Sequence, residues 1–298
     1  MPSAPPLRLA TRGSRQARTQ SEAVASDLRR ATGRDVELVI VDTFGDRTQA
    51  DDVPLHTIGG QGVFVKEVQR AVLDGRADMA VHSAKDLPSE TPLGLRIGAF
   101  TARRSAADVL IGHRLDQLSV GAVVATGSVR RRAQLTMVRP DLRFAELRGN
   151  IPTRLEKVPA DGAVVMALAA LEVLDLVDHV AEVLPIDGFV PAVGQGCVAV
   201  ECRVDDEETD DALGSIDHGV TRRDVEVERA FLAELGSGCS LPVGAHAADG
   251  VLRAFLAEPA ARRYEQRRCD LPAEHGAAIE VARRLAHELH AAVENDER

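Results

Sequence analysis

The stretch Ala80-Val-His-Ser-Ala-Lys-Asp-Leu-Pro88 predicts both a fold class and the place of a site. An apolar strand ends within it, and Lys85 and Asp86 follow side by side. In open α/β sheets, ligands bind at the carboxyl ends of the strands. A neighbouring ammonium keeps a carboxylate ionised, so Asp86 can stabilise a cation and transfer protons there. A plain Asp-Leu-Pro turn that closes the strand is the alternative interpretation.

Strands and helices alternate on both sides of this stretch. A helix over residues 14–31 separates strands at 7–11 and 36–41, and an amphipathic helix with Leu73 on its apolar face follows Gly59-Gly-Gln-Gly62. A similar alternation over residues 121–176 predicts a second α/β lobe, with a cleft between the two. The remaining C-terminal segment predicts a small α+β domain. The expected domains are residues 1–99 with 197–216, residues 100–196, and residues 217–298.

The composition argues against several classes of function and location. The chain has 298 residues, 45% of them hydrophobic, and a formal net charge of −10, which argues against general nucleic-acid binding. The first residues lack the apolar segment of a signal peptide, and no apolar run is long enough to span a bilayer. We therefore expect a cytoplasmic protein with no membrane or nucleic-acid partner. A monomer is also expected, although composition does not decide the oligomeric state.

Arginines cluster in two segments that each follow a predicted strand. Thr126-Gly-Ser-Val-Arg-Arg131 places hydroxyls, a helix N-terminus and two guanidinium groups after a predicted strand, and Leu147-Arg-Gly-Asn-Ile-Pro-Thr-Arg154 repeats the arrangement. With Arg12 and Ser14 in the first lobe, these segments predict a cleft for a ligand with several carboxylates or phosphates. A general bias toward arginine is the alternative explanation.

Of the four cysteines, Cys239 is the candidate for chemistry. It lies in the flexible segment Gly236-Ser-Gly-Cys-Ser240, where a thiol can act as a nucleophile or covalent anchor, although an inert loop cysteine is the plain alternative. Cys197 and Cys202 are expected to be small core residues. The cysteine spacing predicts no metal site.

Seven segments together resemble one known family, porphobilinogen deaminase, also called hydroxymethylbilane synthase. They occur in the family's order and cover nearly the whole chain. The segments are Leu9-Ala-Thr-Arg-Gly-Ser14, Gly59-Gly-Gln-Gly-Val-Phe-Val-Lys66, Ala80–Pro88, Gly127-Ser-Val-Arg-Arg131, Leu147-Arg-Gly-Asn150, Pro191-Ala-Val-Gly-Gln-Gly196 and Gly238-Cys-Ser-Leu-Pro-Val-Gly244.

The resemblance implies a fold, a reaction and a cofactor. The fold would be two lobes like type II periplasmic binding proteins plus a small α+β C-terminal domain. The reaction would join four porphobilinogen molecules head to tail, releasing ammonia, to give 1-hydroxymethylbilane for haem biosynthesis. A dipyrromethane cofactor would be bound through a thioether to Cys239, with Asp86 and Lys85 as catalytic residues.

The resemblance also implies binding residues at matching positions. Those for the cofactor, besides Cys239, are Ser83, Lys85, Asp86, Thr126, Ser128, Arg130, Arg131, Arg148, Asn150 and Arg154. Those for the substrate are Arg12, Ser14, Gln20, Arg148 and Arg154.

The chain departs from the family pattern at Thr57, Gln61, Gly127, Val173 and the segment Ser105-Ala-Ala-Asp108. These departures leave substrate affinity and product length open. Two alternatives therefore stand beside a working synthase. One is a diverged paralogue that makes a shorter or altered oligopyrrole, and the other is a non-catalytic, two-lobed carboxylate-binding protein.

Overall fold

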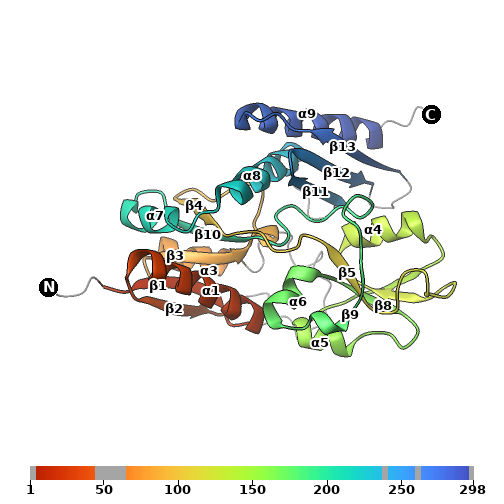
Figure 1. Cartoon of the computed structure of the whole chain (residues 1–298), viewed down its shortest axis with the longest axis horizontal. Helices are drawn as coiled ribbons and strands as arrows, with labels where there is room; N and C mark the ends of the chain where they lie inside the picture. Colours follow the sequence, from red (N-terminus) through yellow and green to blue (C-terminus); the bar gives the residue numbers. More distant parts are fainter. Residues whose placement is uncertain (1–4, 44–64, 237–240, 259–262, 295–298) are drawn as a thin grey trace. The chain divides into compact units, whose positions relative to one another are not determined.

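The computed structural model describes residues 5–43, 65–236, 241–258 and 263–294 (Figure 1). The chain divides into two compact units. Of the described residues, the first unit comprises 5–43, 65–104 and 197–222, and the second comprises 105–196, 223–236, 241–258 and 263–294. We describe each unit by itself.

The first unit is built on a five-stranded sheet with the order β2-β1-β3-β10-β4. Strands β1 and β2 pair in parallel, as do β1 and β3, whereas β10 runs antiparallel to both β3 and β4. The late strand β10 therefore returns to this sheet after the chain has built much of the second unit. The strands are β1 (Leu7–Arg12), β2 (Val36–Val41), β3 (Met79–Ser83), β4 (Leu95–Phe100) and β10 (Val198–Arg203).

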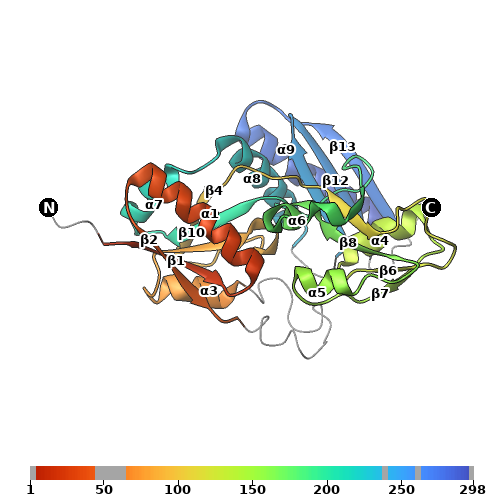
Figure 2. The ribbon, with the colours of Figure 1, turned by 60° about the horizontal axis from the view of Figure 1, so that its bottom comes forward.

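Helices cover both faces of this sheet, with α1 and α3 on opposite sides (Figure 2). Helix α1 (Arg15–Thr32) begins at its N-cap Ser14 and ends at Gly33, whose φ of 70° is the left-handed conformation that glycine adopts readily. Helices α3 (Lys66–Leu73) and α7 (Glu207–Gly214) complete the layers. Leu73 is 42% exposed, so its predicted place on the apolar face of the helix is wrong.

The second unit contains a sheet of the same topology, with the order β7-β6-β8-β5-β9. Strand β5 runs antiparallel to β8 and β9, as β10 does in the first sheet. The strands are β5 (Asp108–Gly112), β6 (Val123–Ala125), β7 (Arg143–Ala145), β8 (Ala163–Ala167) and β9 (Val180–Val183). Side chains of α4 (Val129–Val138) pack on one face, and those of α5 (Ile151–Glu156) and α6 (Leu168–Leu174) pack on the other.

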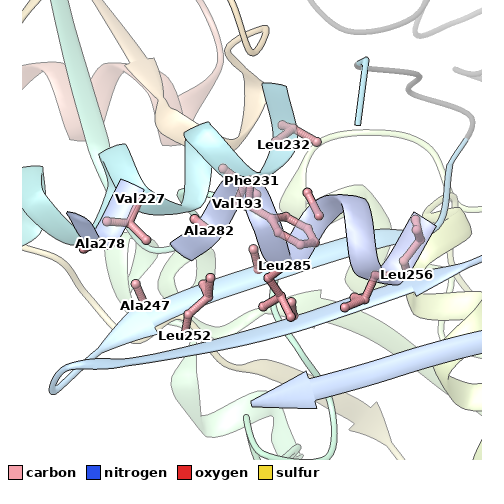
Figure 3. Close-up of a cluster of buried hydrophobic side chains, with 14 of the residues drawn as sticks. Val193, Val227, Phe231, Leu232, Ala247, Leu252, Leu256, Ala278, Ala282 and Leu285 are labelled. Carbon is pink, nitrogen blue, oxygen red and sulfur yellow. The ribbon is translucent and has the colours of Figure 1, made fainter. Parts of the chain in front are cut away.

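A three-stranded antiparallel sheet, β11-β12-β13, forms the C-terminal part of the second unit. Helices α8 (Gly219–Glu234) and α9 (His275–Glu294) cover one face, where Phe231, Leu285 and Leu252 meet in an apolar core (Figure 3). Phe255 on the other face packs against Ala133 of α4. The strands are β11 (Val243–Ala248), β12 (Val251–Ala257) and β13 (Tyr264–Asp270).

The predicted fold class is confirmed. In each large sheet the fourth strand in the order, β10 or β5, runs antiparallel to its neighbours and the first three strands are parallel, which is the arrangement of the periplasmic-binding-protein-like lobes that the sequence predicts. Strands β4, β5, β9 and β13 and helix α7 were not predicted from the sequence. None of the helices in the described ranges is long and apolar enough to cross a membrane.

Candidate active site

The first unit has a pocket at the carboxyl ends of β1 and β3, the edge that the sequence predicts. Asp86 lies in a single turn of 3-10 helix (Ala84–Asp86) that follows β3 directly. Arg12, the last residue of β1, faces the same pocket. The residues that line it are Arg12, Ser14, Gln16, Ala17, Gln20, Val65, Val81, His82, Ser83 and Asp86.

Hydrogen bonds fix the polar side chains of this pocket. Ser14 caps α1, its hydroxyl accepting a hydrogen bond from the Ala17 N–H at 3.3 Å. The Ser83 hydroxyl donates to the Gln20 side-chain oxygen at 3.2 Å, which joins the end of β3 to α1. Lys85 is half-buried and does not line the pocket. The structure thus brings Arg12, Ser14, Gln20, Ser83 and Asp86 together, with one guanidinium and one carboxylate among them.

The second unit gathers the other predicted anion-binding residues at one edge of its sheet. Strands β6 and β7 are parallel neighbours, so the segments after them meet. The Thr126 N–H donates to the Ala145 carbonyl at 2.9 Å, and the Thr126 hydroxyl accepts from the Ser128 N–H at 3.2 Å. Ser128 caps α4, and Asn150 caps α5 by accepting from the Thr153 N–H at 3.1 Å. Thr126, Ser128 and Asn150 therefore shape the backbone of this edge.

Arg130 and Arg131 are buried and share one carboxylate, that of Asp108 at the start of β5. Arg130 Nη2 donates to Asp108 Oδ2 at 2.7 Å, and Arg131 donates to Oδ1 from Nε at 2.9 Å and from Nη2 at 2.7 Å. Their remaining contacts include the backbone oxygens of Val190, at 2.6 Å from Arg130 Nη1, and Val165, at 3.0 Å from Arg131 Nη1. The two buried guanidinium groups and the one buried carboxylate together carry a net charge of +1. The N–H donors named here already have acceptors within the protein.

The electrostatics of this cluster follow from burial and charge. Burial alone raises the pKa of Asp108, but the attraction of Arg130 and Arg131 and their hydrogen bonds outweigh it and hold the pKa at about 2. Burial likewise lowers the pKa of Arg130. Gln195 Nε2 adds hydrogen bonds to Asp108 Oδ1 at 3.0 Å and to the Ala106 carbonyl at 2.7 Å. The carboxylate is therefore ionised throughout the physiological range.

Arg148 differs from this pair. It is 6% exposed, and its Nη1 is buried without a hydrogen-bond partner among the described residues. A buried cationic donor without an acceptor is costly, so this group suits a ligand anion. Arg154 lies on the helix after it and donates from Nε to the Gly149 carbonyl at 2.8 Å. The donor set of this edge fits the carboxylates of a dipyrromethane.

The three described cysteines are poor nucleophiles. Cys197 and Cys202 are buried, as predicted, and burial raises the pKa of the Cys202 thiol to about 11. Burial also raises the pKa of Cys269. Because a thiolate is the reactive form, none of these three is activated for covalent chemistry. Cys239 and the predicted Gly59–Gly62 segment, with Thr57 and Gln61, lie outside the described residues.

The structure shows the surroundings of three departures from the family pattern. A Cβ atom at Gly127 would lie 3.1 Å from the Leu147 carbonyl oxygen, so glycine allows the close approach of the two segments. Val173 packs against the apolar core between the sheet and α6. In the segment 105–108, Ala106 and Ala107 are buried and Asp108 holds the arginine pair.

The sequence analysis did not identify several buried polar residues near these sites. Asp108 and Gln195 support Arg130 and Arg131, and Glu201 lies beside His82 beneath the Asp86 pocket. Each contact joins segments far apart in the chain. His82 itself lies in the stretch 80–88. The sequence signal that could have identified His82, Asp108 and Glu201 is a polar residue within an apolar strand.

The fold and these edges define a class: an α/β protein with two periplasmic-binding-protein-like lobes and guanidinium and hydroxyl groups at the strand ends. The family model "Porphobilinogen deaminase, dipyromethane cofactor binding domain" matches residues 7–211, and "Porphobilinogen deaminase, C-terminal domain" matches residues 223–291. The chain belongs to the porphobilinogen deaminase family. It is therefore a transferase of tetrapyrrole biosynthesis that uses a dipyrromethane cofactor, as the resemblance implied.

Curated relatives and solved structures resemble this chain to different extents. Porphobilinogen deaminase of Brevibacillus brevis is 44% identical over 250 residues, 82% of this chain and 80% of the relative. That of Nitratidesulfovibrio vulgaris is 47% identical over 249 residues, 81% and 78%. Immunogenic lipoprotein A of Vibrio vulnificus has a TM-score of 0.44 at 12% identity, covering 75% of this chain and 99% of its own. A TRAP periplasmic solute-binding protein of Desulfovibrio salexigens has a TM-score of 0.40 at 13% identity, covering 76% of each chain.

Proposed function

We propose that this chain is a working hydroxymethylbilane synthase in which Asp86 is the catalytic carboxylate and Cys239 carries the cofactor. The observation that carries the proposal is the pocket at the ends of β1 and β3, where Asp86 faces Arg12, Ser83 and Gln20 in a chain of this family. The substrate is porphobilinogen, and the product is 1-hydroxymethylbilane.

Asp86 acts on the cation that the reaction creates. When the C–N bond of porphobilinogen breaks, the electron pair leaves with nitrogen as ammonia, and positive charge remains on the methylene and pyrrole ring. A fixed carboxylate beside that charge lowers the barrier without solvent reorganisation. After the new C–C bond forms, the α-carbon loses a proton, and Asp86 is the base that accepts it. Lys85 precedes Asp86 in the same 3-10 turn and is the second residue that we propose for catalysis.

Cationic and polar side chains bind the acetate and propionate groups. Arg12, Ser14 and Gln20 bind substrate from the first unit, with Ser83 beside Asp86. In the second unit, Arg148 gives its buried Nη1 to a carboxylate, and Arg154 and Asn150 lie on the following helix. Thr126 and Ser128 present hydroxyls and backbone at the same edge, while Arg130 and Arg131 provide a fixed positive field.

The dipyrromethane, when bound, supplies the free α-carbon from which the chain of pyrroles grows. Cys239 holds it by a thioether. The raised pKa values of Cys202 and Cys269 and the burial of Cys197 support this choice among the four thiols. The matching segment Gly238-Cys-Ser-Leu-Pro-Val-Gly244 supports it independently.

The proposal also covers the location, the oligomeric state and the domains of the protein. The protein works in the cytoplasm as a monomer, without nucleic-acid or membrane partners. Its domains are residues 1–99 with 197–216, residues 100–196, and residues 217–298. The placement of Val173 in an apolar core and the burial of Ala106 and Ala107 give no support to a paralogue with an altered product.

An intact mass of the purified protein, followed by incubation with porphobilinogen, tests the proposal. We expect a mass above that of the bare chain by one dipyrromethane, and then formation of 1-hydroxymethylbilane. A bare chain that binds oligopyrrole carboxylates without turnover would instead support the non-catalytic binding protein. A holoprotein that releases a shorter oligopyrrole would support the diverged paralogue.

A further inference from the structure

A buried polar cluster lies beneath the Asp86 pocket, on the side of the sheet covered by α3. Residues 80 and 82 of β3 point to the same face, and Ala80 packs with Val68 and Val72 of α3. His82 therefore lies between β3 and that helix, and it is 6% exposed. It also lines the pocket that contains Asp86. One imidazole thus reaches both the apolar layer and the site.

A buried carboxylate holds this imidazole. His82 Nε2 lies 3.1 Å from Oε2 of Glu201, which is 1% exposed and lies on the neighbouring strand β10. Gln69 of α3 donates to both oxygens of Glu201, at 2.9 Å and 3.2 Å. Two backbone segments and a helix therefore fix the carboxylate that faces His82.

The contact of His82 with Glu201 is close. In the described part of the chain, Nε2 is within ion-pair distance of Oε2 but does not meet the geometry of a hydrogen bond. A carboxylate on the Nε2 side places the Nε2 proton there in the neutral imidazole, which leaves Nδ1 as the proton acceptor. The same carboxylate compensates the charge when the ring is protonated.

We propose that His82, held by Glu201 and Gln69, is the relay that takes the α-proton from Asp86 and restores its carboxylate before the next condensation. The proposal rests on the proposed function and deepens it. The transfer is balanced: the Asp86 carboxylic acid loses a proton, directly or through one water, and Nδ1 gains it. The imidazolium then passes the proton to ammonia or bulk water. His82 acts through Asp86 and is a positioning and relay residue, not one that touches substrate.

The charged groups around His82 are few among the residues that the structure describes. Strand β10 provides Glu201, β1 provides Arg12 at the pocket, and the turn after β3 provides Asp86. Helix α3 contributes the neutral Gln69. Glu201 therefore contacts the ring, and Asp86 and Arg12 line the same pocket as His82.

His82→Gln separates a relay from a structural role. A glutamine amide offers an N–H near the position of Nε2, so the contact with Glu201 is kept, but an amide cannot accept a proton at neutral pH. We expect kcat for ammonia release to fall about 10- to 100-fold, in the range of a lost proton-transfer group. The KM for porphobilinogen, the fraction of protein carrying cofactor, and the Tm should stay near wild type.

The matched control is His113→Gln. His113 is a half-buried histidine of the second unit whose Nδ1 lies 3.1 Å from the Gly162 carbonyl oxygen, and its replacement should leave kcat unchanged. Glu201→Gln gives a second test, because it keeps the size of the side chain and removes the charge. It should lower kcat less than His82→Gln, with the same cofactor content.

Three results would overturn the inference. The first is wild-type kcat in His82→Gln. The second is a loss of Tm and cofactor content that matches the loss of kcat, because His82 would then be a structural residue. The third applies if the His82→Gln protein does not fold, and it is wild-type kcat in a folded Glu201→Gln protein. Failure of the proposed function is distinguishable from these results, because the wild-type protein itself would then release no ammonia. The inference would then be wrong as well.

Discussion

Asp108 Oδ1 accepts two hydrogen bonds from Arg131, at 2.9 Å from Nε and at 2.7 Å from Nη2, while its other oxygen accepts from Arg130. The three side chains are 10% exposed or less. The arginine pair that the sequence assigns to a ligand is thus first of all part of the protein interior. Arg148 differs, because its buried Nη1 has no hydrogen-bond partner among the residues that the structure describes.

Asp108→Asn should destabilise the second unit by about 3–5 kcal/mol, because it leaves two buried guanidinium groups without their counter-charge. The measurement is the free energy of unfolding from urea denaturation. Glu146→Gln, which breaks the exposed pair with Arg132, is the control and should change it far less. Equal effects in the two variants would show that the buried cluster adds no special stability.

The same cluster predicts a dependence of stability on pH. The pKa of Asp108 is held at about 2, below the ordinary value of about 3.9 in an unfolded chain. A lowered pKa stabilises the fold above the unfolded value and loses that contribution as pH falls through the folded value. The stability advantage of wild type over Asp108→Asn should therefore be full above about pH 4 and shrink between about pH 4 and pH 2. An advantage independent of pH over this range would contradict the assignment.

Arg148→Leu and Arg131→Leu should have different effects on the Tm. Arg148 Nη1 has no partner among the described residues, so leucine there should block cofactor assembly or elongation while the Tm stays near wild type. Arg131→Leu breaks the contacts with Asp108, so it should lower both cofactor content and Tm. Intact mass and thermal denaturation of each protein give the two readings. Normal turnover in both variants would remove the argument for anion binding.

Replacing each cysteine by serine tests the covalent anchor. We expect the Cys239→Ser protein to have the mass of the bare chain, and the other three variants to keep the adduct. Burial and raised thiol pKa values are the physical reason for excluding Cys202 and Cys269. An adduct on Cys239→Ser, or its loss from another variant that is folded, would move the anchor elsewhere.

The sequence predicts those elements whose pattern is local. Strand β2 has the predicted bounds, 36–41, because it is a run of mostly apolar residues. Strand β13 was missed because its sequence Tyr-Glu-Gln-Arg-Arg-Cys-Asp is almost wholly polar, as an edge strand tolerates.

Strand β5 and the contacts around the sites were missed for another reason. Strand β5 begins with Asp108, whose buried charge is balanced by two arginines of α4. The contact of His82 with Glu201 likewise depends on β10 returning beside β3 late in the chain. Short motifs place Asp86 and Arg12 at strand ends, but they do not show which buried partners hold a charged group.

Asp86→Asn and Asp86→Glu test the catalytic carboxylate. Asparagine keeps the shape but loses charge and basicity, so ammonia release should fall about 100-fold or more. Glutamate keeps the charge but moves it by about 1 Å, and it should retain more activity than asparagine. Both proteins must first be shown to carry the cofactor. A loaded Asp86→Asn protein with near-normal turnover would assign the charge and proton transfer to another group.

The most direct test of the whole account is the ratio of ammonia released to 1-hydroxymethylbilane formed by the wild-type protein with porphobilinogen alone. A synthase that joins four porphobilinogen molecules and releases ammonia at each step gives four ammonia molecules for each bilane. A lower ratio with shorter oligopyrroles, or binding of porphobilinogen without ammonia release, would contradict the account.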